Sequence, residues 1–489
     1  MNRPSSSRVA IVGGGLSGLA TAAQMHLADP SISLSVFESG PRIGGVIDTE
    51  VVDGYILDQG ADMFATQPPA AIELIRQLGL EDRLIEPEPT RRGARIVHRG
   101  RLVPVPEGFV LMRATQLIPM LTTPLLGLTG KVRFLLERFA ARRNHDGDES
   151  VRDFVLRRMG QQVLDRIVAP LAAGIYTADI NKLSMRATMG PIYEMERKFG
   201  SLAAATVARR KSGQDSLERS SAGARYGKFR SFRGGMKELL ESLADSLPPK
   251  AIHLNSSVTG LARSDEGWSI RIQDETTEPF DHVVLAVPPH PASMLLRPLN
   301  EHVAVDLDAI EMASAAIVVL AVPRAQIKGN IDTFGFVVPL SEGRRILAGS
   351  FASHKFAGRA PEDHVIIRVF IGGAMQPELL DHSDDELITI ATDELGELIG
   401  MGSPPTIARV VRWNHAMPQY HVGHVEKVER IDNEMKSLDG ISLVSNALHG
   451  VGIAPVIGLA GRVADQVVAR LEESGDASSS DGVGARSSS

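Results

Sequence analysis

Residues 8–18 read Arg-Val-Ala-Ile-Val-Gly-Gly-Gly-Leu-Ser-Gly and decide the fold of this chain. An apolar run breaks at Gly13, and the spacing Gly13-x-Gly15-x-x-Gly18 leads into a helix-like segment, 19–27. In such a strand–turn–helix unit the first glycine permits the turn, the second lets the backbone approach a pyrophosphate, and the third lets the helix pack on the strand. The stretch predicts an adenine dinucleotide held by a Rossmann-like α/β unit. The residues expected to hold it are Gly13, Gly14, Gly15, Leu16, Ser17 and Gly18.

A carboxylate ends the next predicted strand. Residues 34–38 read Leu-Ser-Val-Phe-Glu, and Glu38 follows Gly18 by twenty positions (38 − 18). A carboxylate at this place is positioned to accept hydrogen bonds from ribose hydroxyls, and it would repel a 2′-phosphate. The alternative interpretation of the glycine pattern is a purely structural turn. The strand before it, the helix after it and the acid at the end of the second strand favour the dinucleotide.

Composition sets the broad class. The 489 residues suggest two or three domains. The formal net charge of −7 gives no reason to expect a nucleic-acid partner. Because the chain has no cysteine, disulfides, iron–sulfur clusters, cysteine zinc sites and a cysteinyl flavin link are excluded. The polar start, 1–7, contains no secretory segment, and we expect a cytoplasmic protein.

The remaining segments complete the expected organisation. No apolar run is long enough for a membrane span, and we interpret the nearest one, 109–128, as broken helices. A strand is expected at 441–445 and a helix at 455–471. The Ser/Gly/Asp-rich end, 473–489, is expected to be a disordered tail.

A second glycine loop follows Glu38. Together with Arg42, Gly44 and Gly45 it gives the pattern E-x-x-x-R-x-G-G. This combination resembles the large flavoprotein superfamily that contains amine oxidases, phytoene desaturases and protoporphyrinogen oxidases. The resemblance makes a flavin a better expectation than NAD. A glycine loop with a solvated arginine is the alternative.

Further blocks, in order along the chain, resemble the oxygen-dependent protoporphyrinogen or coproporphyrinogen oxidase family of haem synthesis. The resemblance spans about residues 9–471, so no single motif carries it. The blocks are 170–179, 183–184, 196–202, 229–239, 335–339, 356–361, 370–373, Trp413, 418–424 and 450–453.

The resemblance implies non-covalent FAD and a discontinuous architecture. An FAD-binding domain is expected at 8–90, 230–290 and 405–472, a mixed-sheet substrate domain at 91–107 and 291–404, and a helical domain at 108–229. The helix expected at 455–471 would place its positive end at the pyrimidine end of the flavin. Further residues expected to contact FAD are Ser39, Val46, Gly60, Ala61, Asp62, Met63, Val258, Trp413, Asn446, Val451, Gly452 and Ile453.

The substrate site is proposed through the resemblance alone. Gly174 would allow close approach, and Val337 and Phe370 would flank pyrrole rings. In many members an arginine that pairs with a propionate occupies the slot where this chain has Ala94. Arg95 is the expected replacement, because a guanidinium suits a carboxylate; Arg92 is the other arginine nearby.

The segment 131–143 combines a helical apolar stripe with basic residues. On periodicity alone, packing against its own domain is favoured. The resemblance instead implies peripheral contact with the inner face of the cell membrane. The stripe is Val132, Leu135, Leu136, Phe139 and Ala140, and the basic residues are Lys131, Arg133, Arg138, Arg142 and Arg143.

The expected reaction removes six electrons from protoporphyrinogen IX in three flavin-dependent steps, with O₂ as the oxidant and H₂O₂ released. Coproporphyrinogen III, with four propionates rather than two, is the alternative substrate. An amine oxidase, a carotenoid desaturase and a non-catalytic flavin-binding protein are less favoured. A homodimer is left open. No metal is expected, because His415, His421 and His424 lack a supporting set of carboxylates.

Overall fold

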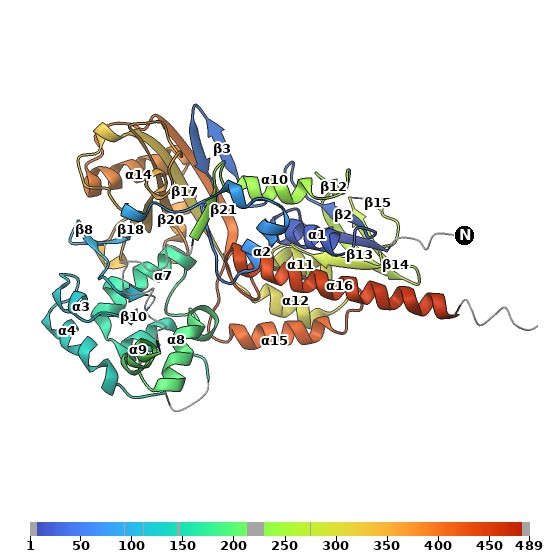
Figure 1. Cartoon of the computed structure of the whole chain (residues 1–489), viewed down its shortest axis with the longest axis horizontal. Helices are drawn as coiled ribbons and strands as arrows, with labels where there is room; N and C mark the ends of the chain where they lie inside the picture. The colour runs from blue at the N-terminus through green and yellow to red at the C-terminus, as the bar shows by residue number, and fades with distance from the viewer. Residues whose placement is uncertain are drawn as a thin grey trace, which may run out of the picture.

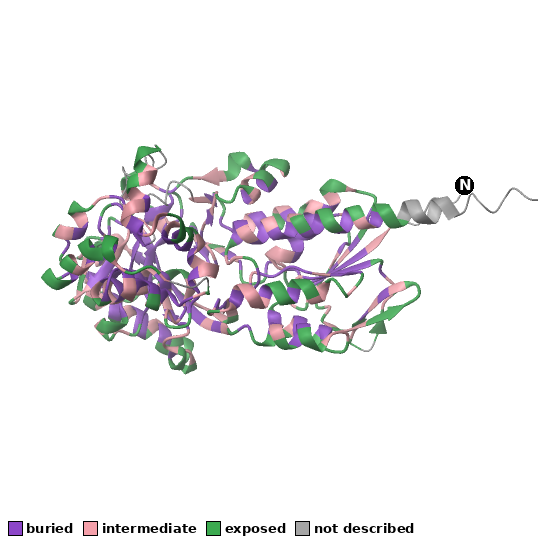
Figure 2. Ribbon diagram, turned by 90° about the horizontal axis from the view of Figure 1, so that it is seen from below, coloured by how far each residue is buried: buried purple, intermediate pink, exposed green. Residues whose placement is uncertain are grey.

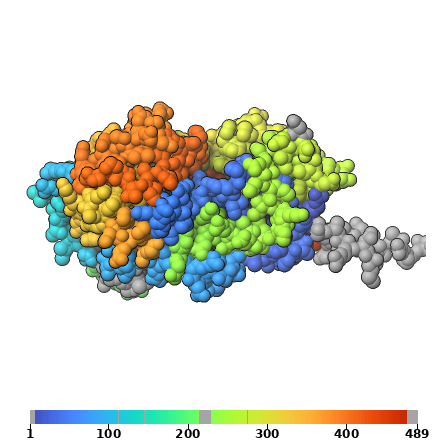
Figure 3. All heavy atoms as spheres, turned by 90° about the horizontal axis from the view of Figure 1, so that it is seen from above, coloured from blue at the N-terminus to red at the C-terminus, as the bar shows by residue number. Residues whose placement is uncertain are grey.

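The computed structural model describes residues 7–91, 93–110, 112–143, 147–212, 229–273 and 275–481. Figure 1 shows three parts: a nucleotide-binding half on the right, a sheet-based part at upper left and a helical part at lower left. Each part has a hydrophobic core of its own. Segments far apart in the chain, coloured blue, green and orange in Figure 3, meet on one face of the molecule.

The nucleotide-binding half is built on a five-stranded sheet in which every pair is parallel. The two central strands, β1 and β16, are buried and apolar along almost their whole length, as expected of strands covered on both faces. The sheet confirms the Rossmann-like α/β class. In sheet order the strands are β12 (Ile252–His253), β2 (Ser33–Phe37), β1 (Arg8–Val12), β16 (His282–Leu285) and β22 (Ile441–Leu443).

Helices cover both faces of this sheet (Figure 2). On one face a core forms between the sheet and α1 (Leu16–Ala28), α2 (Ala70–Gln77), α10 (Lys237–Asp245) and α16 (Ile453–Asp481). On the other face lie α11 (Pro289–Leu296), α12 (Glu301–Asp308), α15 (His424–Met435) and the hairpin of β13 (Val258–Ser264) with β14 (Gly267–Ile272). The sheet is therefore the middle of three layers.

The second part is a seven-stranded mixed sheet with α14 (Asp384–Ile399) packed on one face. All its strand pairs are antiparallel except β18 with β7. In order the strands are β21 (Ile407–Pro418), β17 (Met312–Pro323), β20 (His364–Gly372), β19 (Ala348–Phe351), β18 (Gly335–Val337), β7 (Arg95–His98) and β8 (Arg101–Pro104).

The sheets place two segments differently from the sequence analysis. Residues from 405 onward are expected in the FAD-binding domain, but β21 is hydrogen-bonded to β17 in the mixed sheet. Residues 291–404 are expected in the substrate domain, but the apolar residues of α11 and α12 pack with β16 and α15 in the nucleotide-binding half. A strand or helix pattern shows that an apolar face exists and does not show which core will bury it.

The helical part contains α3 (Ile118–Thr122), α4 (Leu128–Leu135), α5 (Val151–Arg158), α7 (Ala169–Tyr176), α8 (Met185–Phe199) and α9 (Leu202–Lys211). Its first residues form a short hairpin of β9 (Phe109–Val110) and β10 (Arg113–Ala114). The expectation of broken helices over 109–128 is therefore wrong for the first half of that run.

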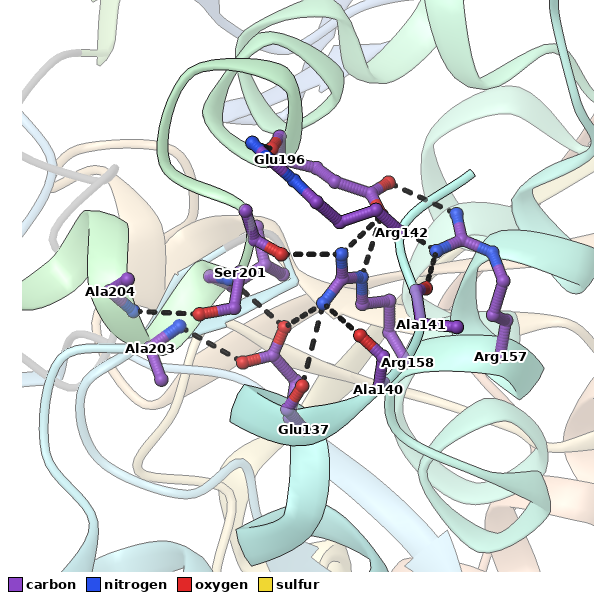
Figure 4. A network of polar contacts seen from close by, with 12 residues as sticks. Glu137, Ala140, Ala141, Arg142, Arg157, Arg158, Glu196, Ser201, Ala203 and Ala204 are labelled. Atoms are coloured by element: carbon purple, nitrogen blue, oxygen red, sulfur yellow. Dashed lines mark hydrogen bonds and ion pairs between the residues drawn. The ribbon is translucent and has the colours of Figure 1, made fainter. Parts of the chain in front are cut away.

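A buried ion network holds the helical part together (Figure 4). Arg158, whose side chain is fully buried on α5, pairs with Glu137 at 3.2 Å and with Glu196 of α8. Glu137 in turn accepts hydrogen bonds from the amides of Leu202 at 2.9 Å and Ala203 at 3.0 Å, which open α9. Four chain segments therefore share one set of charges.

Glu137 belongs to a short 3₁₀ turn, Leu136–Phe139, that continues α4. The predicted stripe does not pack on its own domain, because Val132, Leu135 and Leu136 are exposed and Phe139 is 79% exposed. Leu128, one turn before the stripe, is 80% exposed. We call this surface the apolar patch. Its members are Leu117, Ile118, Leu128, Val132, Leu135, Leu136 and Phe139.

Two points concern the ends and the membrane. Helix α16 continues to Asp481, past Leu471, where the sequence predicted the helix to end, so the first part of the expected tail is helical. The rest of that tail, 482–489, lies outside the described residues. Among the described helices, none has the length and apolar character needed to cross a bilayer.

Candidate functional site

The turn between β1 and α1 requires glycine at two positions. Gly13 has φ +113°, and its amide donates to the carbonyl of Phe37 at 2.8 Å. A Cβ on Gly18 would lie 1.9 Å from the carbonyl oxygen of Gly13. At Gly15, by contrast, the nearest atom to an added Cβ is Gly45 Cα, 4.0 Å away. The chain therefore leaves open space at Gly15, which fits a ligand that approaches the backbone closely.

Helix α1 begins at this open space. Its N-cap, Gly15, has no side chain to cap the first turn, so the amides of Leu16, Ser17 and Gly18 have no capping partner. Together with the positive end of a 13-residue helix, these donors suit an anionic group. The geometry fits the diphosphate of a dinucleotide.

Glu38 lies at the edge of the same turn. Its carboxylate accepts from the amide of Gly14 at 2.8 Å and from that of Gly40 at 2.7 Å, so both oxygens are fixed in direction. Ser39 adds a hydroxyl contact at 3.3 Å. The backbone oxygen of Glu38 accepts from the amide of Ser256 at 2.8 Å, which brings the start of β13, Val258, to this end of the sheet. The structure thus brings together the predicted ribose and adenine residues.

The second glycine loop faces the first. The amide of Gly44 donates to the carbonyl of Gly14 at 2.9 Å. The guanidinium of Arg42 donates to the carbonyls of Ile43 and Gly45, each at 3.0 Å, and lies 3.5 Å from Asp48. Arg42 therefore braces the loop backbone. Val46, the next predicted residue, is exposed.

The loop that contains Gly60 lies where β21 meets the nucleotide-binding half. A Cβ on Gly60 would meet the carbonyl oxygen of Val46 at 2.4 Å and the ring of Trp413 at 3.3 Å. The indole nitrogen of Trp413 is buried and has no hydrogen-bond partner among the described residues. An orphaned donor beside a crowded glycine loop fits a polar ring system such as a flavin.

The C-terminal loop before α16 is the last piece of the predicted cofactor site. Gly450 and Gly452 have φ values of +133° and +115°, which favour glycine. Ile453 packs into the core under α1, and Val451 packs against the core of the helical part. Asn446 offers its carbonyl to the hydroxyl of Tyr420. This loop therefore joins two parts of the molecule.

A cavity of about 610 Å³ opens between the mixed sheet and the helical part. Its walls include all four predicted substrate residues and three residues of the Gly60 loop. Gly174 of α7 lies so close to Val337 of β18 that an added Cβ would be 3.1 Å from its Cγ1. The predicted residues on the walls are Ala61, Asp62, Met63, Arg95, Gly174, Val337 and Phe370.

The charges of the cavity are few. Arg95 donates from Nη1 to the carbonyl of Leu102 at 3.5 Å and forms no ion pair with a carboxylate of the described residues. Asp332 is exposed. Lys355, on the short helix α13 (Ala352–Lys355), pairs with Asp62 at 2.9 Å. Arg92, the other arginine considered from sequence, lies outside the described residues.

Sequence reasoning missed Lys355. Its side chain is 9% exposed, and a buried lysine is uncommon unless it is paired. The local sequence, Ser-His-Lys-Phe, carries no pattern that marks it as a cavity residue. The aromatic walls at Phe109, Phe334 and Phe336 were also missed.

The three histidines considered as ligands point to separate partners. His415 lies 3.4 Å from the carbonyl of Met312, His421 lies 3.8 Å from Glu311, and His424 lies 3.1 Å from the carbonyl of Leu448. Burial lowers the pKa of His424 to about 4, so its ring is neutral at pH 7. The described residues contain no group of three histidines or carboxylates placed to hold a metal.

The family described as flavin containing amine oxidoreductase matches residues 16–468. The chain belongs to this family. It is therefore an oxidoreductase whose cofactor is FAD, and the open glycine cradle, the uncapped helix and the orphaned indole nitrogen fit that cofactor.

Its relatives include porphyrinogen oxidases. A coproporphyrinogen III oxidase of Propionibacterium freudenreichii subsp. freudenreichii is 33% identical over 94% of this chain and 90% of the relative. One of Bacillus subtilis (strain 168) is 30% identical over 92% of this chain and 95% of the relative. A solved structure from Exiguobacterium sp. 255-15, provisionally described as a protoporphyrinogen oxidase, has a TM-score of 0.83 at 26% identity and covers 95% of this chain and 99% of its own.

Proposed function

We propose that this flavoenzyme oxidises a porphyrinogen in the 610 Å³ cavity, as a step of haem biosynthesis, with O₂ as the oxidant and H₂O₂ as the by-product. The observation that carries the proposal is that one cavity joins the predicted flavin loop, at Ala61–Met63, to the predicted porphyrin residues. When bound, FAD supplies the two-electron chemistry, and three such oxidations convert a porphyrinogen into a porphyrin.

The chain's own residues would bind and orient the cofactor. The first glycine turn and the N-terminus of α1 would hold the diphosphate, and Glu38 would hold the adenosine ribose. The loop from Gly450 to Ile453 would hold the pyrimidine end at the start of α16. Trp413 would lie against the ring system, since its indole nitrogen is buried without a partner.

The cavity walls suit a large apolar substrate with carboxylate arms. Val337 of β18 and Phe370 of β20 both pair with Ala348 of the strand between them, and Gly174 keeps α7 close to Val337. Arg95 has no carboxylate partner among the described side chains, so its guanidinium is available to a propionate. These contacts orient the substrate and leave the electron transfer to the cofactor.

Two substrates fit this description. Protoporphyrinogen IX, placed first by the sequence analysis, carries two propionates, and coproporphyrinogen III carries four. The two bacterial relatives at 33% and 30% identity carry the coproporphyrinogen name. Two cations, Arg95 and Lys355, line the cavity. Both observations favour coproporphyrinogen III.

The deciding experiment uses the purified, FAD-loaded protein in air with each porphyrinogen in turn. Product fluorescence and H₂O₂ are followed together, with heat-inactivated protein as the control for spontaneous oxidation. We expect the rate to exceed the control for at least one porphyrinogen, and to be higher with coproporphyrinogen III. Rates equal to the control for both would overturn the proposed function. A preference for protoporphyrinogen IX would reverse the order of the two substrates.

We also infer peripheral contact with a membrane through the apolar patch. The patch lies beside Lys131 and Arg138, so apolar and cationic side chains share a surface, as in helices that lie on anionic lipid. The turn that carries Phe139 is anchored by the buried ion network through Glu137, which fixes the patch in an exposed position. A rigid exposed apolar surface indicates a binding surface.

A further inference from the structure

Five charged side chains lie together at one wall of the cavity, each at most 9% exposed. Asp62 pairs with Lys355 at 2.9 Å and with Arg368 at 3.1 Å. Asp58 pairs with Arg359 at 3.3 Å. In these pairs three cations share two carboxylates, which leaves one positive charge in excess.

Burying this unbalanced positive charge is energetically unfavourable. A charge removed from water is tolerated only where another charge or a set of hydrogen bonds compensates it. Two nitrogen atoms of the group, Arg359 Nη1 and Arg368 Nε, are buried without a hydrogen-bond partner among the described residues. Burial raises the pKa of Asp62, but the charges of Lys355 and Arg368 outweigh this effect and hold that pKa far below its ordinary value. Asp62 is therefore ionised and fully engaged.

Only part of this group reaches the cavity. Asp62 and Lys355 are on its wall, whereas Arg368 lies behind Phe370, with its guanidinium carbon 5.4 Å from the centroid of that ring. Of the three cations, Lys355 is the one that lines the cavity among the described residues, so an anion in the cavity would meet the excess charge there. An ammonium has three N–H donors, and Asp62 receives one of them.

Lys355 and Arg95 come from different places in the mixed sheet. Lys355 follows β19, and Arg95 lies on β7, two strands away in the order β19-β18-β7. Two strand spacings separate these strands by about 10 Å. The cavity thus presents two cations on separate parts of its wall, which suits a substrate with more than one carboxylate.

Resting on the proposed porphyrinogen oxidation, we propose that Lys355 is a specificity-determining residue that binds a second carboxylate of the substrate. The ammonium compensates a propionate, and the propionate compensates the buried positive excess behind Phe370. The interaction requires a carboxylate on the substrate, so a porphyrin without carboxylates should lose it entirely.

The test measures binding rather than turnover. The FAD-loaded protein is titrated with two stable probes, coproporphyrin III and its tetramethyl ester, and porphyrin fluorescence gives the two Kd values. Lys355→Met keeps the length of the side chain and removes its charge. We expect it to weaken binding of the acid about tenfold or more, the worth of a charged hydrogen bond, and to leave the ester within about twofold. Lys355→Arg should retain acid binding.

Two further variants complete the design. Lys436→Met removes an exposed lysine at the C-terminal end of α15 and should change neither Kd. Asp62→Asn removes the competing carboxylate and should tighten binding of the acid relative to the ester. Its FAD content is measured first, because Asp62 also belongs to the predicted flavin loop. Because Lys355→Met and Asp62→Asn are expected to change acid binding in opposite directions, the second variant tests the proposal even if the first does not fold.

Each possible result of these titrations leads to a different conclusion about Lys355. An equal loss of acid and ester binding in Lys355→Met would show that Lys355 only supports the fold of the wall. Unchanged acid binding in that variant, or no tightening in Asp62→Asn, would also overturn the proposal. If the unsubstituted protein binds neither porphyrin, the proposed function itself fails.

Discussion

The hydroxyl of Tyr420 accepts a hydrogen bond from the backbone amide of Gly450 at 3.0 Å. The same hydroxyl donates to the carbonyl of Asn446, so one side chain ties both ends of the loop that precedes α16. Burial raises the pKa of Tyr420 well above its ordinary value, which keeps the donor proton in place. Its carbonyl accepts from the amide of Ser184 at 2.7 Å, the N-cap of α8. Tyr420 therefore joins the helical part to the predicted flavin loop.

Tyr420→Phe should loosen that loop. The variant leaves the partly buried amide of Gly450 and the partly buried carbonyl of Asn446 without their partner, a cost of up to about 1–3 kcal/mol for each group. We expect the Kd for FAD, measured by ultrafiltration and flavin absorbance, to rise by about tenfold. Tyr55→Phe is the matched control, because Tyr55 is buried in the ribbon of β3 (Thr49–Val52) and β4 (Tyr55–Asp58). Equal FAD affinity in the two variants would show that the tie does not support the cofactor.

Gly15 and Gly18 should respond differently to substitution. Gly15→Leu places a side chain in the open cradle, where the nearest atom to its Cβ is Gly45 Cα at 4.0 Å, so the protein should fold and remain colourless. Gly18→Ala places a Cβ 1.9 Å from the carbonyl of Gly13 and should destabilise the turn itself. Flavin absorbance after purification and the thermal unfolding midpoint separate the two effects. Retained yellow colour in Gly15→Leu would refute its role at the diphosphate.

The glycine turn could be predicted from the sequence because its function lies in local geometry. Gly13, Gly15, Gly18 and Glu38 belong to one strand–turn–helix–strand unit, in which spacing alone brings them together. The pairing of Lys355 with Asp62 could not be predicted, because 293 positions separate them and only the packed sheets bring them into contact.

The apolar stripe shows a different limit. Helical spacing identified Val132, Leu135 and Phe139 as one face, and these side chains do share a surface. Periodicity is identical for a face that packs on a core and for a face that meets a partner, so it could not tell which applies. The membership of β21 in the mixed sheet could not be predicted either, since the sequence of residues 407–418 does not indicate which sheet it will pair with.

Arg158→Met should strongly destabilise the helical part. The substitution leaves Glu137 and Glu196 buried without their shared cation, although Arg157 still pairs with Glu196 at 2.6 Å. Loss of one partner of a buried pair costs about 3–5 kcal/mol. Thermal unfolding should therefore begin several degrees lower than in the unsubstituted protein. Arg76→Met, which breaks an exposed pair with Glu81, is the control and should cost less than about 1 kcal/mol.

Leu128→Ser with Phe139→Ser should abolish most binding to lipid vesicles. Both side chains are about four-fifths exposed, and transfer of each large apolar side chain from water contributes about 1.5–3 kcal/mol. We expect flotation with vesicles that contain anionic lipid to fall by at least about tenfold. Val51→Ser, at an exposed apolar position on β3, should leave it unchanged. If the unsubstituted protein does not float with these vesicles, the inferred membrane contact is wrong.

His282 and His424 should make the fold sensitive to acid. Burial lowers the pKa of His282 to about 3, with Arg470 adding to the effect, and lowers that of His424 to about 4. In the unfolded chain both rings take up a proton near the ordinary value of 6.5. Below that value the unfolded state binds protons that the folded state refuses, so stability present at pH 7 is lost as the pH falls towards 4.

The slope of the free energy of unfolding against pH shows how many histidines take part. Each histidine should contribute roughly 1.4 kcal/mol for every pH unit between about 6 and 4. His282→Asn keeps a polar group near Ser442, whose hydroxyl lies 2.9 Å from the imidazole, and should reduce the slope by the share of one proton. His302→Asn changes an exposed histidine and should leave the slope unchanged. Denaturation curves at pH 7.5, 6 and 5 supply the comparison, and carboxylates contribute equally to all three proteins. Parallel slopes for His282→Asn and the unsubstituted protein would mean that the His282 ring is protonated in the folded state.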